Sequence, residues 1–159
     1  MTLGVARKLR TLLEERGADV VMTRDTRSGV DLVRRPQIAE DADAELLVSI
    51  HGNALADGRN PYTNSGTTVF YYHPRAVPLA RAIDRALVRQ LGFPDLGVAR
   101  GDLHVARATW MPSVLVEGLF MMVPAQEAVL VADDGQWRYA RGVLEGIEAF
   151  LAERVARDR

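Results

Sequence analysis

The sequence predicts an α/β domain of three layers, with a mainly parallel central sheet flanked by helices. Two apolar runs of strand length support this prediction, Glu45–His51 and Ser113–Val116. A continuous apolar run of this length is typical of a strand that is covered on both faces, as in a parallel sheet. Segments with helical spacing of apolar residues, Thr2–Arg16 and Val77–Leu91, lie before and between these runs. This alternation is typical of α/β folds.

The remaining elements are predicted from residue type and from turn signals. Thr2 is a candidate N-cap for the first helix, and Gly17 is its candidate stop signal. Residues 54–66 contain Gly, Pro, Asn and Asp and are expected to form a surface loop, and a glycine-rich loop is expected after residue 91. In chain order we further expect a strand at Asp19–Thr23, a helix at Val33–Ala42, a strand at Gly66–Tyr72, a short strand at Leu103–Arg107 and a final helix at Gln136–Arg154.

The opening helix has no strand ahead of it. A helix followed at once by Val20-Val21-Met22 is typical of the second half of a βαβ unit. We therefore expect that the first strand of the fold is missing from this chain.

Length and composition predict one domain that covers residues 1–159, with no linker or internal repeat. The net charge of -1 argues against a nucleic-acid partner. The absence of cysteine excludes disulfides, thiolate metal sites and cysteine nucleophiles. No apolar run approaches the roughly 20 residues of a membrane span, and we recognise no signal-peptide pattern in these residues.

His51 is the most informative single residue. It ends a buried apolar strand and precedes Gly52-Asn53, at the sheet edge where ligands gather in open α/β folds. An imidazole there could bind a metal or transfer protons. The alternative is a histidine that caps the strand and is hydrogen-bonded to a neighbouring loop, and its position does not separate the two.

Glu117 follows a buried Val-Leu-Val run and precedes Gly118. Burial would raise its proton affinity, as a general base near neutral pH requires. The alternative is a structural ion pair, with Arg34, Arg35 or Arg107 as partner. A histidine and a glutamate at one sheet edge are, however, the minimal parts of a metal-assisted hydrolase.

The two other histidines carry less information. His73 is expected to be an exposed residue at a strand end, and His104 could line a pocket near the same edge but is more often a packing residue in such a position. The sequence has no Gly-x-Ser-x-Gly, phosphate-loop or His-Glu-x-x-His motif, so it does not support a serine hydrolase, a nucleotide-binding protein or a zincin.

The chain as a whole resembles a known family, the zinc-dependent N-acetylmuramoyl-L-alanine amidases of family 3, in particular AmiC-like catalytic domains. The similarity extends over essentially the full chain, and the order and spacing of its motifs are more specific than any one motif. The matching segments are Leu12–Asp25, an arginine before the next helix (Arg34 or Arg35), Leu47-Val48-Ser49-Ile50-His51-Gly52-Asn53, Gly66 with Val69–Tyr72, Leu79-Ala80, and Met111–Gly118.

The resemblance implies a peptidoglycan hydrolase that cleaves the lactyl–L-alanine amide bond with one zinc ion. Carried over by residue, His51 is a zinc ligand and Glu117 is the catalytic base, while Asn53 and His104 are candidate substrate-binding residues. The family's other two zinc ligands, a histidine and a glutamate, are expected upstream of Met1. Met121-Met122-Val123 also replace a polar pair that relatives often have there.

Because a catalytic zinc normally has three protein ligands, we expect this chain to bind zinc weakly or not at all and to have little amidase activity. An alternative is a non-catalytic cell-wall-binding or regulatory module on the same fold, and a third hypothesis is hydrolysis of a different amide. The expected partner is peptidoglycan, with no nucleic acid. The expected location is periplasmic, extracellular or in the cell wall, inferred from the substrate class alone.

Overall fold

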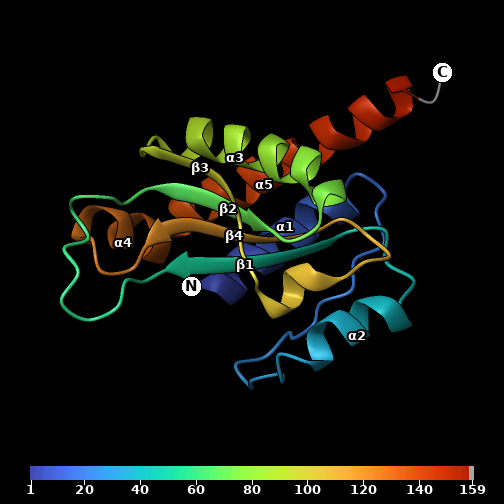
Figure 1. The fold of residues 1–159 in the computed structure, drawn as a ribbon, viewed down its shortest axis with the longest axis horizontal. Coiled ribbons are helices and arrows are strands. Elements are labelled where there is room, and N and C mark those ends of the chain that lie inside the picture. The colour runs from blue at the N-terminus through green and yellow to red at the C-terminus, as the bar shows by residue number, and fades with distance from the viewer. Residues whose placement is uncertain (158–159) are drawn as a thin grey trace.

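The computed structural model describes residues 1–157 and shows one α/β unit (Figure 1). Its helices and strands follow the predicted alternation, with 3-10 turns (η) at two connections. In chain order they are α1 (Thr2–Glu14), α2 (Arg34–Asp41), β1 (Leu47–Asn53), β2 (Thr67–Tyr71), η1 (Pro74–Ala76), α3 (Val77–Leu91), β3 (Asp95–Arg100), η2 (His104–Arg107), β4 (Ser113–Phe120), α4 (Pro124–Val131) and α5 (Asp133–Arg157).

The four strands form one sheet in the order β1-β4-β2-β3. β1 runs parallel to β4 and β2 runs parallel to β3, whereas β2 and β4 are antiparallel. The prediction of an α/β fold with a mainly parallel sheet is therefore confirmed, with one antiparallel pair that the apolar runs did not indicate. β1 forms one edge of the sheet, and β4 lies at its centre.

Helices cover the two faces of the sheet unequally. The larger core lies against α1, α3 and α5, and it includes Val5, Val116 and Tyr139. The opposite face carries a smaller cluster around Leu115 and Met111, under η2 and the end of α2. Figure 1 shows α2 on that side, with the short η2 turn beside it. The smaller cover leaves part of that face open at the carboxyl ends of β1 and β4.

Helices α3 and α5 approach each other closely because α5 carries glycines at the contact. A Cβ added at Gly146 would lie 2.4 Å from the Cα of Ile83, and one at Gly142 would lie 2.8 Å from the Cδ2 of Leu87. Any larger residue would push the two helices apart. This contact fixes the larger layer against the sheet.

Three local predictions are wrong. Asp19–Thr23 forms no strand, since no neighbouring strand of the described residues pairs with it and an isolated extended segment has no ladder to join. Leu103–Arg107 is not a strand, because His104–Arg107 turns into η2. Thr2 does not cap α1: the N-cap position is Met1, which forms no side-chain capping bond.

Two elements arise where the sequence predicted none. β3 lies within the expected glycine-rich loop and pairs only with β2, as an edge strand with Gly97 at φ 73°. Helix α4 begins at Pro124, which is tolerated in a first helical turn because its missing N–H has no partner there. Residues 54–66 form the predicted loop between β1 and β2.

Candidate active site

His51 and Glu117 stand opposite each other on neighbouring strands. They are register partners in the parallel β1–β4 pair, near the carboxyl end of each strand. Side chains alternate between the faces of a strand, and register partners point to the same face. Since Ser49, two residues before His51, bonds to that ring, and Leu115, two before Glu117, packs in the smaller cluster, both side chains lie on the less covered face.

The imidazole ring of His51 contacts a hydroxyl group of its own strand. Its Nε2 lies 2.9 Å from the hydroxyl oxygen of Ser49. Burial lowers the pKa of His51, and the positive charges of Arg35 and Arg24 lower it further. The imidazole is therefore neutral near pH 7, which is the form that binds metals. The alternative of a hydrogen bond to a neighbouring loop is not what the structure shows.

Glu117 carries a half-buried carboxyl group. Its Oε2 is buried and accepts no hydrogen bond within residues 1–157. Burial raises the pKa of Glu117 to about 7. The suggested ion-pair partners are engaged elsewhere: Arg34 with Asp41 at 3.2 Å, Arg107 with Asp102 at 2.6 Å, and Arg35 with a backbone carbonyl.

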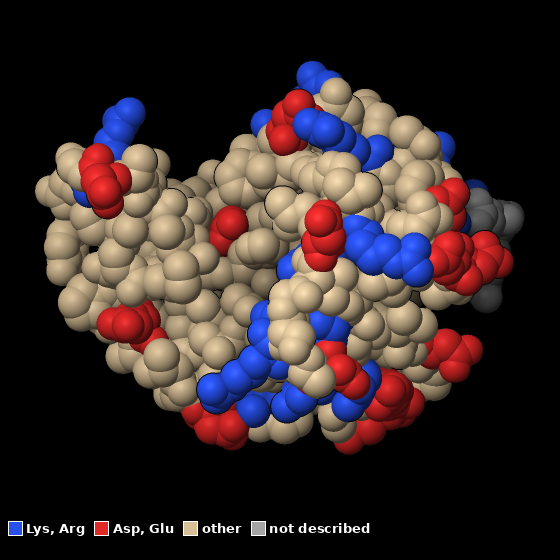
Figure 2. Space-filling view, turned by 90° about the horizontal axis from the view of Figure 1, so that it is seen from below, with Lys and Arg blue, Asp and Glu red and all other residues tan. Residues whose placement is uncertain are grey.

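The structural ion pair is therefore not formed, and the carboxyl group is free to exchange a proton near neutral pH. Figure 2 views the molecule from below and shows acidic and basic side chains interspersed over that face, with a larger uncharged area on the left of the view. A half-buried carboxyl group with a raised pKa is suited to general base catalysis.

Tyr139 supports the strand pair from the opposite face. Its hydroxyl group lies 2.9 Å from the backbone oxygen of His51 and 3.0 Å from that of Val116. Gly118 provides the room for the ring, since a Cβ there would lie 2.2 Å from Cε1 of Tyr139. The role of Tyr139 could not be predicted from the sequence, because a tyrosine within a helical pattern has no local signal for a contact 88 residues away.

Asn53 ends β1 beside the site. Its side-chain oxygen accepts a hydrogen bond from the backbone N–H of Ala54 at 2.8 Å, so it shapes the exit of the strand. The register between β1 and β4 shifts between His51 and Asn53. A Cβ at Gly52 would meet Met1 and Met121 at 2.6 and 3.1 Å, so the glycine allows these methionines to pack against β1.

The other two histidines form no hydrogen bond with this pair within residues 1–157. His104 begins η2, which packs against β1 and β4, but its ring forms no hydrogen bond with His51 or Glu117 in the described part of the chain. His73 lies 3.0 Å, through Nε2, from the backbone oxygen of Arg107. The structure thus brings together His51 and Glu117, and their roles and those of Asn53 and His104 stay predictions.

The metal expected from the resemblance can be tested against these side chains. Neutral His51 has the right chemistry for a zinc ligand. Within residues 1–157, however, no group of three His, Cys, Asp or Glu side chains is placed to hold a metal ion. A zinc ion with three protein ligands therefore does not fit these residues by themselves.

Comparison with known proteins identifies the family to which this chain belongs. Residues 1–149 match the model of a protein family described as N-acetylmuramoyl-L-alanine amidase. The chain is 28% identical over 152 residues to the probable cell wall amidase LytH of Staphylococcus saprophyticus, covering 96% of this chain and 49% of that protein. LytH of Staphylococcus aureus is 26% identical, with 95% and 49% covered. The chain thus spans about half the length of the curated relatives it matches.

Solved structures show the same fold. The catalytic domain of CwlV, an N-acetylmuramoyl-L-alanine amidase from Bacillus (Paenibacillus) polymyxa, superposes with a TM-score of 0.86 at 31% identity, covering 94% of this chain and 82% of that one. AmiC2 of Nostoc punctiforme gives a TM-score of 0.87 at 29% identity, with the same coverage.

A third structure, the CwlD amidase of Clostridioides difficile in complex with the GerS lipoprotein, gives a TM-score of 0.84 at 25% identity, covering 94% of this chain and 84% of that one. The family model covers nearly the whole chain, and the fold is that of amidase catalytic domains. The chain belongs to the N-acetylmuramoyl-L-alanine amidase family.

Proposed function

We propose that this domain is the catalytic unit of a peptidoglycan amidase, which hydrolyses the amide between the lactyl group of muramic acid and L-alanine. The observation that supports this proposal is the juxtaposition of His51 and Glu117 at one sheet edge, in a chain of the amidase family.

Glu117 is the proposed general base. Its unpartnered Oε2 and a pKa of about 7 allow it to take a proton from the water that attacks the amide carbonyl. The same group can then return that proton to the amine of the departing peptide.

The proposal also includes dependence on a metal ion. His51 is a proposed zinc ligand, and relatives in this family are expected to use zinc. Because residues 1–157 supply no group of three ligands, we propose that this stretch alone binds zinc weakly and hydrolyses muropeptides slowly.

The test compares residues 1–159 with a version extended by the sequence encoded ahead of Met1. Bound zinc is measured by atomic emission on purified protein, and release of stem peptide from defined muropeptides is followed by mass spectrometry. We expect substoichiometric zinc and little release for residues 1–159, and both to rise in the extended version. One zinc per chain in the short form would overturn the proposal.

A second candidate function is a non-catalytic cell-wall-binding or regulatory module, favoured by the same lack of a ligand group within residues 1–157. Sedimentation with purified peptidoglycan separates the two candidates. If the extended version binds peptidoglycan but releases no peptide, the module is the better account. Release of a different amide product would support the third hypothesis, another substrate on this scaffold.

The proposed partner is peptidoglycan, and the proposed place of action is outside the cytoplasmic membrane, as for relatives named cell wall amidases. None of the helices formed within residues 1–157 is long and apolar enough to cross a membrane. CwlD was solved in complex with a lipoprotein. Co-purification would test whether this chain also binds a protein partner.

A further inference from the structure

β4 carries one extra residue directly after Glu117. In the pairing with β1, Glu117 is the partner of His51. Two residues later in β1, Asn53 is already the partner of Phe120, three residues after Glu117. Two residues of β4 therefore lie opposite one residue of β1, which defines a β-bulge. Bulges are rare in parallel pairs, and those next to active sites redirect a side chain.

The pairing of β4 with β2 ends at the same point. Thr68 and Glu117 are the last antiparallel partners in the direction in which β4 runs. Glu117 is therefore the final residue of β4 that strands on both sides hold in register. Residues 118–120, which follow it, are buried, so their backbone N–H and C=O groups need partners other than water.

Two buried side chains from outside the β1–β4 pair supply such partners. The hydroxyl group of Thr67 donates to the backbone oxygen of Gly118 at 3.0 Å, and Thr67 is 0% exposed. The side-chain oxygen of Gln126 accepts a hydrogen bond from the backbone N–H of Phe120 at 2.8 Å, and Gln126 is 3% exposed. These bonds hold the bulge in one conformation, because a buried backbone group is costly to leave without a partner.

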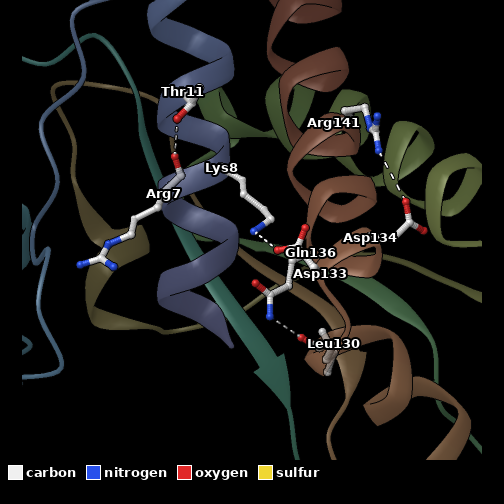
Figure 3. Close-up of polar contacts among 8 residues, drawn as sticks. All are labelled: Arg7, Lys8, Thr11, Leu130, Asp133, Asp134, Gln136 and Arg141. Atoms are coloured by element: carbon white, nitrogen blue, oxygen red, sulfur yellow. Dashed lines mark hydrogen bonds and ion pairs between the residues drawn. The ribbon is translucent and has the colours of Figure 1, made fainter.

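Helix α4, which carries Gln126, is itself bonded to α5. Gln136 of α5 donates to the backbone oxygen of Leu130 in α4 at 3.0 Å (Figure 3). The amide nitrogen of Gln126 also donates to the hydroxyl group of Ser65 at 3.0 Å, near the end of the loop 54–66. Gln126 therefore links the bulge to a helix layer on one side and to the loop that follows β1 on the other.

From these observations we propose that Thr67 and Gln126 are positioning residues, which hold the bulge after Glu117 and so fix the direction of its side chain. This inference rests on the proposed function of Glu117 as general base. No hydrogen bond to its Oε2 within residues 1–157 fixes the orientation of the carboxyl group. The backbone from which the side chain projects therefore sets its direction. A general base acts only within hydrogen-bond reach of the proton that it takes.

The test uses substitutions that remove or keep the bonds to the bulge. Thr67→Val removes the hydroxyl group at similar volume, whereas Thr67→Ser keeps it. Gln126→Met removes the acceptor for the backbone N–H of Phe120. Ser113→Ala is the matched control, because Ser113 is 1% exposed and its hydroxyl group donates to the backbone oxygen of Val105 at the other end of β4.

The first measurement follows the Glu117 side chain without any catalysis. Three-bond scalar couplings to its Cγ, measured by NMR in residues 1–159, report the χ1 rotamer. We expect one rotamer in the parent, Thr67→Ser and Ser113→Ala, and averaged couplings in Thr67→Val and Gln126→Met. Averaged couplings in the parent, or the parent rotamer in Thr67→Val or Gln126→Met, would overturn the inference. Should Thr67→Val fail to fold, Gln126→Met decides the same question.

The second measurement is the rate of stem-peptide release by the extended version. Positioning acts on the chemical step and not on substrate binding, so Thr67→Val should lower kcat at least about 10-fold and leave KM within about two-fold of the parent. Thr67→Ser should restore most of kcat, and Ser113→Ala should retain it. Equal losses of kcat in Thr67→Val and Ser113→Ala would indicate a general effect on the fold and would overturn the inference.

Failure of the positioning role and failure of the proposed function give different results. If the parent extended version releases no stem peptide, the amidase is rejected, and the Glu117 couplings still decide whether the bulge fixes that side chain. If release depends on Glu117 but Thr67→Val keeps the parent kcat, the amidase stands and the positioning role is rejected.

Discussion

The substitution Tyr139→Phe tests how the fold holds the two strands of the site together. It deletes one hydroxyl group that lies 2.9 Å from the backbone oxygen of His51 and 3.0 Å from that of Val116, and it leaves the ring in place. Tyr139 is 1% exposed, so water cannot replace the lost donor. A buried hydrogen bond of this kind contributes about 1–2 kcal/mol to the free energy of unfolding.

The assay is urea unfolding followed by tryptophan fluorescence. With a denaturant slope of about 2 kcal/mol per molar urea, Tyr139→Phe should lower the midpoint by about 0.5–1 M. Tyr62→Phe is the matched control, because Tyr62 is 70% exposed and should leave the midpoint unchanged. Equal midpoints for the two variants would refute the role of the Tyr139 hydroxyl group.

Two further predictions concern the stability of the fold. Burial, then the charge of Asp95 and a hydrogen bond with it, raise the pKa of Asp84 to about 7. The unfolded state releases this proton near pH 4, so stability should fall by up to about 4 kcal/mol as the pH rises from 4 to 7. Asp84→Asn should flatten this part of the profile of urea midpoint against pH, and an unchanged slope would contradict the assignment. Gly146→Ala should lower the melting temperature by several degrees because its Cβ would lie 2.4 Å from the Cα of Ile83, whereas Gly29→Ala, with open space around it, should not; similar melting temperatures would argue against the close helix contact.

The fold class and most of the core elements could be predicted from the sequence. Apolar runs and the helical spacing of apolar residues can be recognised without knowing which elements pack beside them. The runs that became β1 and β4 and the helix Val77–Leu91 are of this kind. The direction of β2 against β4 could not be predicted, since a buried apolar strand has the same pattern in either direction. β3 was not predicted because Gly97 interrupts its strand pattern. It is also an edge strand, which needs only one neighbouring strand for its hydrogen bonds.

The strand predicted at Asp19–Thr23 is absent because this segment has no strand to pair with in the described residues. Its β-branched residues suit a strand, but a strand exists only through pairing, and no strand among residues 1–157 pairs with it. α4 was missed because Pro124 and the apolar residues around it show no amphipathic period.

The candidate site was accessible to sequence reasoning only in its chemically distinctive parts. His51 and Glu117 stand out because ionisable residues are rare within buried apolar strands, and the structure places them in register. The support from Tyr139 depends on a contact between α5 and β1, which no local pattern encodes.

The most direct test of the proposed amidase is the rate of stem-peptide release by the extended version that carries Glu117→Gln, compared with its parent. Glu127→Gln, at an exposed position of α4, is the matched control, and circular dichroism checks that each variant is folded. If Glu117 is the general base, release should fall by at least about 100-fold, and the control should retain the parent rate. A Glu117→Gln variant within a few-fold of its parent would contradict the central role given to this carboxyl group.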